Sequence, residues 1–264
     1  MSWHRRTLLG GLAATCCGGA AMAQWPGGNQ SSPEAPTTAT ALKGCMIGSL
    51  SQIHYTLFGD SKEELFIEDV FDWCSGCLDL VDGTMVLFDG PDSYNALATP
   101  ENLVLQRGEG TVLLGRQLIA FHKKNFGSRW GSALAASLAH EVGHLVQYKR
   151  GLRLPTRTAE LHADYLAGWA LERFRLKSGL DKFSDTSVAR QSLYLLQSRM
   201  KDDAVHGSAD ERVRAFDGGR DYALGHLAHD ELKQVPVDAG LEFLGGSMAS
   251  LNFDGNVAGW ASCA

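Results

Sequence analysis

Hydrophobic and polar positions follow two different patterns along this chain. Between residues 84 and 115, short runs of aliphatic residues are bounded by Gly, Pro and Asp, a pattern typical of strands. Beyond residue 128, apolar residues recur at helical spacing over longer segments. Strands followed by helices favour an α+β domain.

The predicted strands lie in the first of these parts. Thr84–Phe88 is predicted to be a strand that ends at the turn over residues 89–91. Residues 102–106 and 111–115, joined by a turn at 107–110, are predicted to form a β-hairpin. The sheet is therefore expected to be small.

Helices are predicted where apolar residues follow a capping residue or stop at Gly. Ser61 with Glu64, and Ser208 with Glu211, form capping boxes, and Gly151 is placed as a helix stop. The Gly-rich tail after Pro236 is predicted to be a loop with one strand. The predicted helices span residues 61–73, 116–125, 129–150, 156–178, 186–201, 208–216 and 221–233.

The first 23 residues have the features of an export signal. Arg5 and Arg6 precede an apolar stretch, and residues 21–23 form a small-x-small cleavage signal. The arginine pair resembles the twin-arginine type, with an ordinary secretory signal as the alternative. A periplasmic or secreted protein is expected. The predicted organisation is a signal peptide over 1–23, a flexible Pro/Gly/Ser/Thr linker over 24–42, a folded domain over 43–233 and a Gly-rich segment over 234–264.

Composition narrows the class of protein. The chain has 264 residues, of which 44% are hydrophobic and 20% charged, so it can bury a full-sized core. Cleavage of the signal would leave 22 basic and 30 acidic side chains, which argues against binding to nucleic acid. No later apolar run has the length of a transmembrane helix, so a soluble mature protein is expected.

Four cysteines remain after cleavage: Cys45, Cys74, Cys77 and Cys263. An exported protein is expected to form disulfides, but four cysteines allow three pairings and the sequence does not choose among them. Cys74 and Cys77 could alternatively form half a zinc site or a redox pair. Both alternatives lack the second cysteine pair or the surrounding motif that they require.

The predicted helix over residues 129–150 contains an HExxH sequence whose histidines are His140 and His144. Residues four apart on an α-helix lie about 40° apart around the axis and roughly 6 Å apart along it. Both imidazoles can therefore reach one metal ion, and Glu141 beside them can carry protons.

Glu160 and Asp164 have the same spacing on the next predicted helix, which a short connection makes an antiparallel neighbour. Glu160 can then approach an ion held by the two histidines. Asp164 can accept the other ring N–H of one of them. Two His and one Glu leave a fourth zinc position for water, as in catalytic sites, and Glu141 would act as general base and then acid.

These motifs resemble a known family. Residues 140–147, HEVGHLVQ, and 160–168, ELHADYLAG, are similar to the gluzincin metallopeptidases, most of all to a group of bacterial neutral zinc metallopeptidases. They are also similar, more distantly, to HtpX-like peptidases, without the membrane helices of that group. The resemblance implies a zincin-like fold with a small mixed sheet, an active-site helix pair and one catalytic Zn²⁺ ion.

A third segment agrees with the resemblance. Residues 206–208, His-Gly-Ser, and 211–213, Glu-Arg-Val, are similar to a downstream segment of HtpX-like enzymes whose His and Arg lie near the active site. The resemblance implies that His206 donates a hydrogen bond to the developing oxyanion, unless it only precedes the helix cap. Arg212 is expected to orient Glu160 or Asp164, or to form a surface ion pair.

The resemblance also implies a place for the substrate. In zincins, a strand before the helices forms a sheet edge along which an extended peptide pairs. Residues 111–115 are the candidate here, with a peptide or unfolded protein as partner, and an ordinary edge strand is the alternative. His162 is expected to be exposed. Gly143 lowers the stability of a helix interior by about 1 kcal/mol relative to Ala, which suggests that another backbone approaches closely there.

The sequence therefore predicts an exported, soluble zinc endopeptidase that uses Glu141 as general base. One alternative is a zincin-fold protein that has become a non-catalytic binding or chaperone module. A less favoured alternative is a deformylase-like zinc amidohydrolase, whose third ligand is a Cys in a Glu-Gly-Cys motif. None of Cys45, Cys74 and Cys77 follows Glu-Gly.

Overall fold

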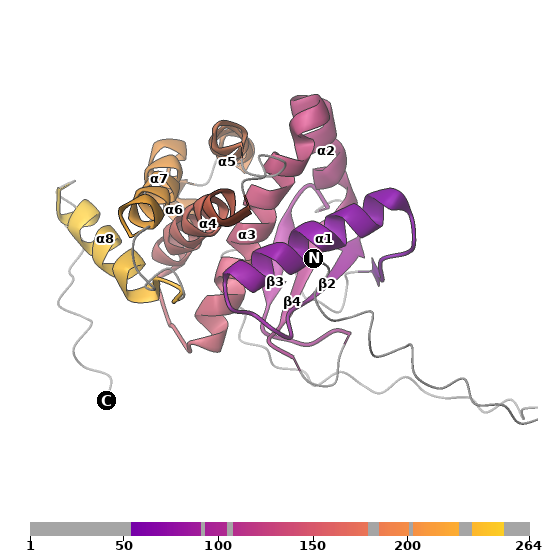
Figure 1. The fold of residues 1–264 in the computed structure, drawn as a ribbon, viewed down its shortest axis with the longest axis horizontal. Coiled ribbons are helices and arrows are strands. Elements are labelled where there is room, and N and C mark those ends of the chain that lie inside the picture. Colours follow the sequence, from indigo (N-terminus) through magenta and orange to yellow (C-terminus); the bar gives the residue numbers. More distant parts are fainter. Residues whose placement is uncertain are drawn as a thin grey trace, which may run out of the picture. The chain divides into compact units, whose positions relative to one another are not determined.

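The computed structural model describes residues 54–90, 93–104, 108–178, 185–200, 203–226 and 234–250. The predicted signal peptide, the linker, Cys45 and Cys263 lie outside these residues. The described part is an α+β domain, as predicted, with one small sheet and a larger set of helices (Figure 1).

The described strands form one mixed sheet in the order β1-β2-β4-β3. β2 and β4 are parallel, whereas β1 and β3 are antiparallel to their neighbours. The strands are β1 (Tyr55–Thr56), β2 (Thr84–Phe88), β3 (Ala96–Thr99) and β4 (Thr111–Gly115).

The predicted hairpin is wrong, because residues 102–104 form no strand and β4 pairs instead with β3. Hydrogen bonds of polar side chains hold the segment between β3 and β4 in a loop. Asn102 Oδ1 accepts a hydrogen bond from Gly110 N at 3.0 Å, and Thr111 Oγ1 donates to Glu101 O at 2.8 Å. β4 consequently lies inside the sheet, between β2 and β3, and is not the edge strand that the sequence suggested.

The two faces of the sheet contribute to different hydrophobic clusters, because successive residues of a strand point to opposite sides. Leu87, Val112 and Leu114 belong to the main core, together with residues of the first three helices. Val86 and Leu113 belong to a smaller cluster on the other face. The three helices are α1 (Lys62–Cys77), α2 (Arg116–Phe126) and α3 (Trp130–Lys149), with a 3-10 turn, η2 (Gly127–Arg129), before α3.

α3 is the central helix of the domain. Every residue from Gly131 to Gln147 is buried, so the helix packs on all sides rather than along one apolar stripe. Gly151 follows its end with φ 66°, a conformation that Gly adopts at little cost, which confirms the predicted stop.

The helices after α3 form a second group, which lies to one side of the strands in Figure 1. α4 packs against α3, α7 and α8. A Cβ atom on Gly168 would lie 1.9 Å from Phe216 O, so the backbones of α4 and α7 are in direct contact. The helices are α4 (Thr156–Ser178), α5 (Thr186–Met200), α6 (Asp203–His206), α7 (Ala209–Gly225) and α8 (Val237–Ser250).

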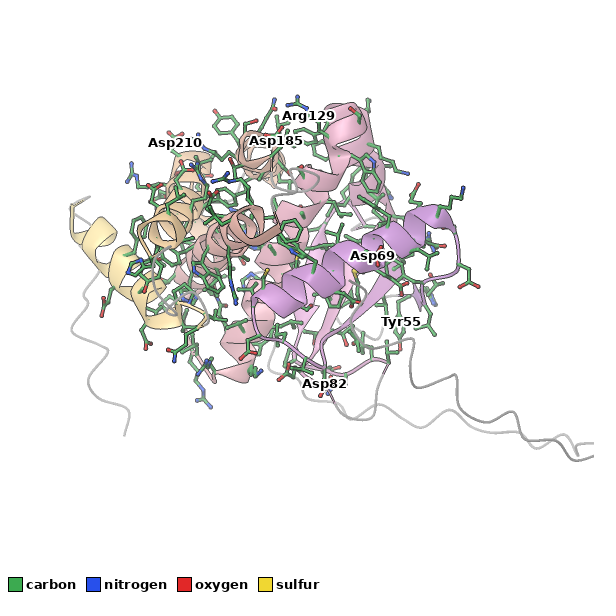
Figure 2. All side chains as sticks on the ribbon, in the orientation of Figure 1. Tyr55, Asp69, Asp82, Arg129, Asp185 and Asp210 are labelled. Carbon is green, nitrogen blue, oxygen red and sulfur yellow. The ribbon has the colours of Figure 1, made fainter. Side chains whose placement is uncertain are left out.

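The start of α5 is fixed by Asp185. Its Oδ1 accepts hydrogen bonds from Ser187 N at 3.1 Å and from Val188 N at 3.3 Å. Its Oδ2 lies 3.3 Å from Arg129 Nη1, at the start of α3, and Figure 2 shows the two side chains next to each other. This exposed ion pair adds little stability. α5 packs against α3 through Val188, which forms a hydrophobic cluster with Phe126 and Ala133.

The C-terminal segment differs from the prediction. It forms α8 rather than a loop with a strand, although its glycines disfavour a helix. Burial of Val237 and Leu244 compensates for that low propensity. A Cβ on Gly240 would lie 2.9 Å from His162 Cδ2, so glycine permits close packing on α4. The predicted helix over 221–233 is in part the end of α7, and residues 227–233 lie outside the described residues.

Cys74 is a buried thiol whose Sγ lies 3.7 Å from Ala135 O. The described residues contain no disulfide. Cys45 and Cys263 lie outside the described residues, so disulfides that involve them stay a prediction. No helix in the described part of the chain is long and apolar enough to cross a membrane.

Candidate metal centre

His140, His144 and Glu160 converge at the contact between α3 and α4. The two helices are antiparallel, as predicted, because Gln147 contacts Ala159 whereas the earlier His140 contacts the later Asp164. The two Nε2 atoms are 3.2 Å apart. Glu160 Oε2 lies 3.3 Å from His140 Nε2, and Glu160 Oε1 lies 3.6 Å from His144 Nε2. Two ligand atoms about 2.0–2.1 Å from one tetrahedral zinc ion would be about 3.4 Å apart, so these separations fit a shared ion.

Hydrogen bonds on the far side of each ring fix which nitrogen faces the site. His140 Nδ1 lies 2.8 Å from Asp164 Oδ1, and a carboxylate only accepts, so this nitrogen donates. His144 Nδ1 lies 3.0 Å from Gln147 Oε1 and donates in the same way. Both Nε2 lone pairs therefore point at the Glu160 carboxylate. Three acceptors that face one another in this way are stabilised by a cation.

The electrostatics of the site agree with a bound cation. Burial lowers the pKa of His140, but the charge and hydrogen bond of Asp164 and the hydrogen bond of Glu160 outweigh it and raise that pKa to about 10. Burial raises the pKa of Glu160, yet His144, His140 and His206 together hold it well below its usual value. The site thus favours positive charge next to an ionised Glu160.

Glu141 lies on α3 beside the two histidines and is buried. Its Oε2 has no hydrogen-bond partner among the described residues. Burial raises the pKa of Glu141, His140 and His144 lower it, and Glu160 raises it again, with a net rise. A buried carboxylate with a raised pKa and one oxygen left open suits a group that takes up and releases a proton.

Arg212, from the first turns of α7, binds Asp164 through two hydrogen bonds. Arg212 Nε lies 2.7 Å from Asp164 Oδ2, and Nη2 lies 2.9 Å from Oδ1. Both residues are buried, so Arg212 forms no surface ion pair. The structure thus shows Arg212 in contact with Asp164, and Asp164 in contact with His140.

His206, the last residue of α6, lies at the same site just before α7 begins. Its Nδ1 lies 3.2 Å from Glu160 Oε2, although the two groups are not aligned as a hydrogen bond. Gly207 follows with φ 78°, and the complete Ser208–Glu211 capping box then starts α7. His206 therefore lies next to Glu160, and its role as oxyanion donor stays a prediction.

A narrow cavity of about 20 Å³ opens next to Glu141. This volume accommodates about one water molecule or ion. Its apolar wall includes Leu193 and Leu196 of α5. The sequence did not point to these residues, because nothing in their own segment marks them as neighbours of the HExxH helix. The lining residues are Asn95, Ala96, Leu118, Ser137, His140, Glu141, Glu160, Leu193, Leu196, His206 and Arg212.

Two further polar residues behind the site were not predicted. Gln147 contacts His144, and its position three residues further along the same helix is the signal that could have identified it. His162 was expected to be exposed, but this is wrong: its exposed fraction is 0%. α8 covers the face of α4 that carries His162, and the sequence did not predict that helix.

No protein-family model, no curated protein and no solved structure matches this chain. The likeness to gluzincin metallopeptidases therefore rests on the motif residues alone. The coarser conclusion is that His140, His144 and Glu160 form a buried group that could hold a metal ion.

Proposed function

We propose that the protein is an exported zinc-dependent endopeptidase. The observation that carries the proposal is the convergence of two imidazole nitrogens and one carboxylate at separations of 3.2–3.6 Å, with the open carboxylate of Glu141 beside them. Two His and one Glu are a common ligand set of catalytic zinc in peptidases. The export part of the proposal rests on the N-terminal sequence features.

The ligand types favour zinc among divalent metals. Imidazole nitrogens suit zinc, whereas calcium and magnesium prefer sites made of oxygen ligands. Zinc bound by such residues polarises a carbonyl group and lowers the pKa of a water. The proposal thus assigns one ion to His140, His144 and Glu160.

The side chains around that ion carry out proton transfer, stabilise the oxyanion and orient a ligand. Glu141 takes the proton of the attacking water and passes it to the leaving amine. His206 lines the same cavity, and we assign to it the hydrogen bond to the developing oxyanion. Asp164, held by Arg212, keeps the Nδ1 proton on His140 so that Nε2 stays free to bind the ion.

The substrate strand is assigned to β3, because β4 lies inside the sheet. Gly115 N donates to Asn95 O at 3.1 Å. Residues of an antiparallel ladder alternate between facing the partner and facing away, so Ala96 and Ala98 direct their backbone groups to the open edge. Tyr148 OH contacts Ala98 O at 3.4 Å, and Ala96 lines the cavity. An extended peptide that pairs with Ala96 would thus pass the candidate metal.

Neither alternative function gains support from the site. A deformylase-like enzyme requires a Cys ligand, and the third member of this group is Glu160. A non-catalytic binding module has no need of a buried carboxylate at position 141.

The test combines metal content with hydrolysis. The wild-type protein and Glu141→Gln are assayed for zinc by mass spectrometry and for cleavage of a fluorescently labelled unfolded protein. We expect one zinc per chain in both and cleavage only in the wild type, lost with chelator and restored by zinc. Equal cleavage by Glu141→Gln would refute the mechanism, and a wild type without zinc would refute the site.

A further inference from the structure

A chain of hydrogen bonds connects His144 to the start of α8. Gln147 Oε1 lies 3.0 Å from His144 Nδ1, and Gln147 Nε2 lies 3.1 Å from His162 Nδ1. His162 Nε2 then lies 3.0 Å from the carbonyl oxygen of Val237, the first residue of α8. Side chains from α3 and α4 and a backbone group of α8 thus form one connected path.

Each group in this path has a single possible role. Gln147 Nε2 also donates to Ala159 O at 2.8 Å, which identifies it as the amide nitrogen and leaves Oε1 to accept from His144. The second hydrogen of that nitrogen goes to His162 Nδ1, which must accept. His162 Nε2 therefore carries the hydrogen and donates to Val237 O. Every hydrogen bond of the path therefore donates in the direction from His144 to Val237. This direction requires that Nδ1 of His144 carries a hydrogen.

The path is shielded from water. The exposed fractions of Gln147 and His162 are 3% and 0%. A buried amide or imidazole that lost its partner would cost about 1–3 kcal/mol, so each link resists rotation of the next. Gly240 keeps α8 close enough to cover His162, since a Cβ there would lie 2.9 Å from its Cδ2.

We propose that Gln147 is the positioning residue of His144, and that His162 together with the first turn of α8 holds Gln147 in place. The inference rests on the proposed zinc site. The two histidine ligands then have different hydrogen-bond partners. His140 is held by a charged pair, Asp164 and Arg212. His144 is held by neutral side chains, Gln147 and, behind it, His162. Docking of the C-terminal helix is thereby coupled to metal affinity.

The test uses two substitutions of Gln147 with opposite consequences. Gln147→Met preserves volume but removes the acceptor from His144. Gln147→Glu keeps an acceptor there but removes the donors to Ala159 O and His162. The zinc dissociation constant of the full-length protein is measured by competition with a chromophoric chelator. Loss of an outer hydrogen bond to a ligand weakens metal binding by about 10–100-fold, which we expect for Gln147→Met. Gln147→Glu keeps the acceptor but loses the two contacts that hold it, so we expect it to weaken zinc binding less than Gln147→Met.

A purely structural role for Gln147, as a bridge between α3 and α4, predicts equal losses in the two variants and would overturn the proposal. So would wild-type affinity in Gln147→Met. Zinc absent from the wild type would instead refute the proposed function. If Gln147→Met does not fold, Gln147→Asn, whose oxygen is one methylene too short to reach His144, takes its place with the same expectation.

Two further measurements complete the design. The visible spectrum of the cobalt-substituted protein reports ligand geometry, and it is expected to change in Gln147→Met and to persist in Gln147→Glu.

His162→Phe is expected to weaken zinc binding less than Gln147→Met, because Ala159 O still holds the amide. Unchanged affinity in His162→Phe would remove His162 and α8 from the proposal. Thr111→Val, which removes a buried hydroxyl in the sheet, is the control and should leave zinc affinity unchanged.

Discussion

A Cβ atom on Gly143 would lie 3.2 Å from both the Cα and the carbonyl oxygen of Ala163, so α3 and α4 meet backbone to backbone at the candidate metal centre. The sequence predicted a close approach at Gly143, and the structure confirms it and identifies α4 as the neighbour. Ala163 lies between Glu160 and Asp164. The glycine therefore controls how near both carboxylates come to the HExxH helix.

Gly143→Ala should affect metal binding more than stability. Alanine gains about 1 kcal/mol of helix propensity, which offsets the strain of separating the helices by a few tenths of an ångström. We expect the free energy of unfolding to stay within about 1 kcal/mol of the wild type. Zinc affinity should fall several-fold. Gly76→Ala, with open space around its Cβ, is the control, and an equal fall there would contradict this explanation.

Arg212→Met should destabilise the protein strongly. It leaves the Asp164 carboxylate buried without its charged partner, which typically costs about 3–5 kcal/mol. Urea unfolding of the zinc-free protein measures this cost. Adding Asp164→Asn removes the buried negative charge that has lost Arg212, so the double variant should recover part of the stability. A double variant no more stable than Arg212→Met would show that the ion pair is not the cause.

Ala96→Pro should separate substrate binding from metal binding. The Ala96 N–H points away from β4, so proline removes no hydrogen bond of the sheet at this edge position. We expect zinc content to be unchanged and KM for a peptide substrate to rise about tenfold, which corresponds to one lost hydrogen bond. Ala98→Pro, two residues further from the cavity, is the control. Unchanged KM in Ala96→Pro would make β3 an ordinary edge strand.

His122 should make the fold sensitive to acid. Burial lowers the pKa of His122 from 6.5 to about 3, so between these pH values the unfolded chain binds a proton that the folded protein does not. Stability is fully present above pH 6.5 and is lost as the pH falls through this window. From pH 6.5 to 4.5 the loss is about 2–3 kcal/mol.

His122→Gln isolates this contribution. Urea unfolding with chelator present, at pH 7 and at pH 4.5, should show a smaller acid loss in the variant than in the wild type. The chelator removes metal release as a second source of acid sensitivity. Equal losses in the two proteins would mean that His122 is not the group responsible.

Much of the helical part could be predicted from the sequence. Ser61, Ser208 and Gly151 each mark a helix end through hydrogen bonds or a φ value within a few residues. Such signals are local, and so they survive whatever the rest of the chain does. The strands were harder: β4 was predicted, but its partner β3 was not, because pairing depends on segments that are apart in the chain.

The sequence by itself determined the spacing of the candidate site. His140 with His144, and Glu160 with Asp164, lie four residues apart, and 3.6 residues per helical turn place each pair on one helix face. The tertiary structure decided the rest. The interior place of β4, the formation of α8 and the burial of Gln147 and His162 all follow from contacts between distant segments. Local propensity cannot predict these contacts, because burial against a neighbouring element outweighs it.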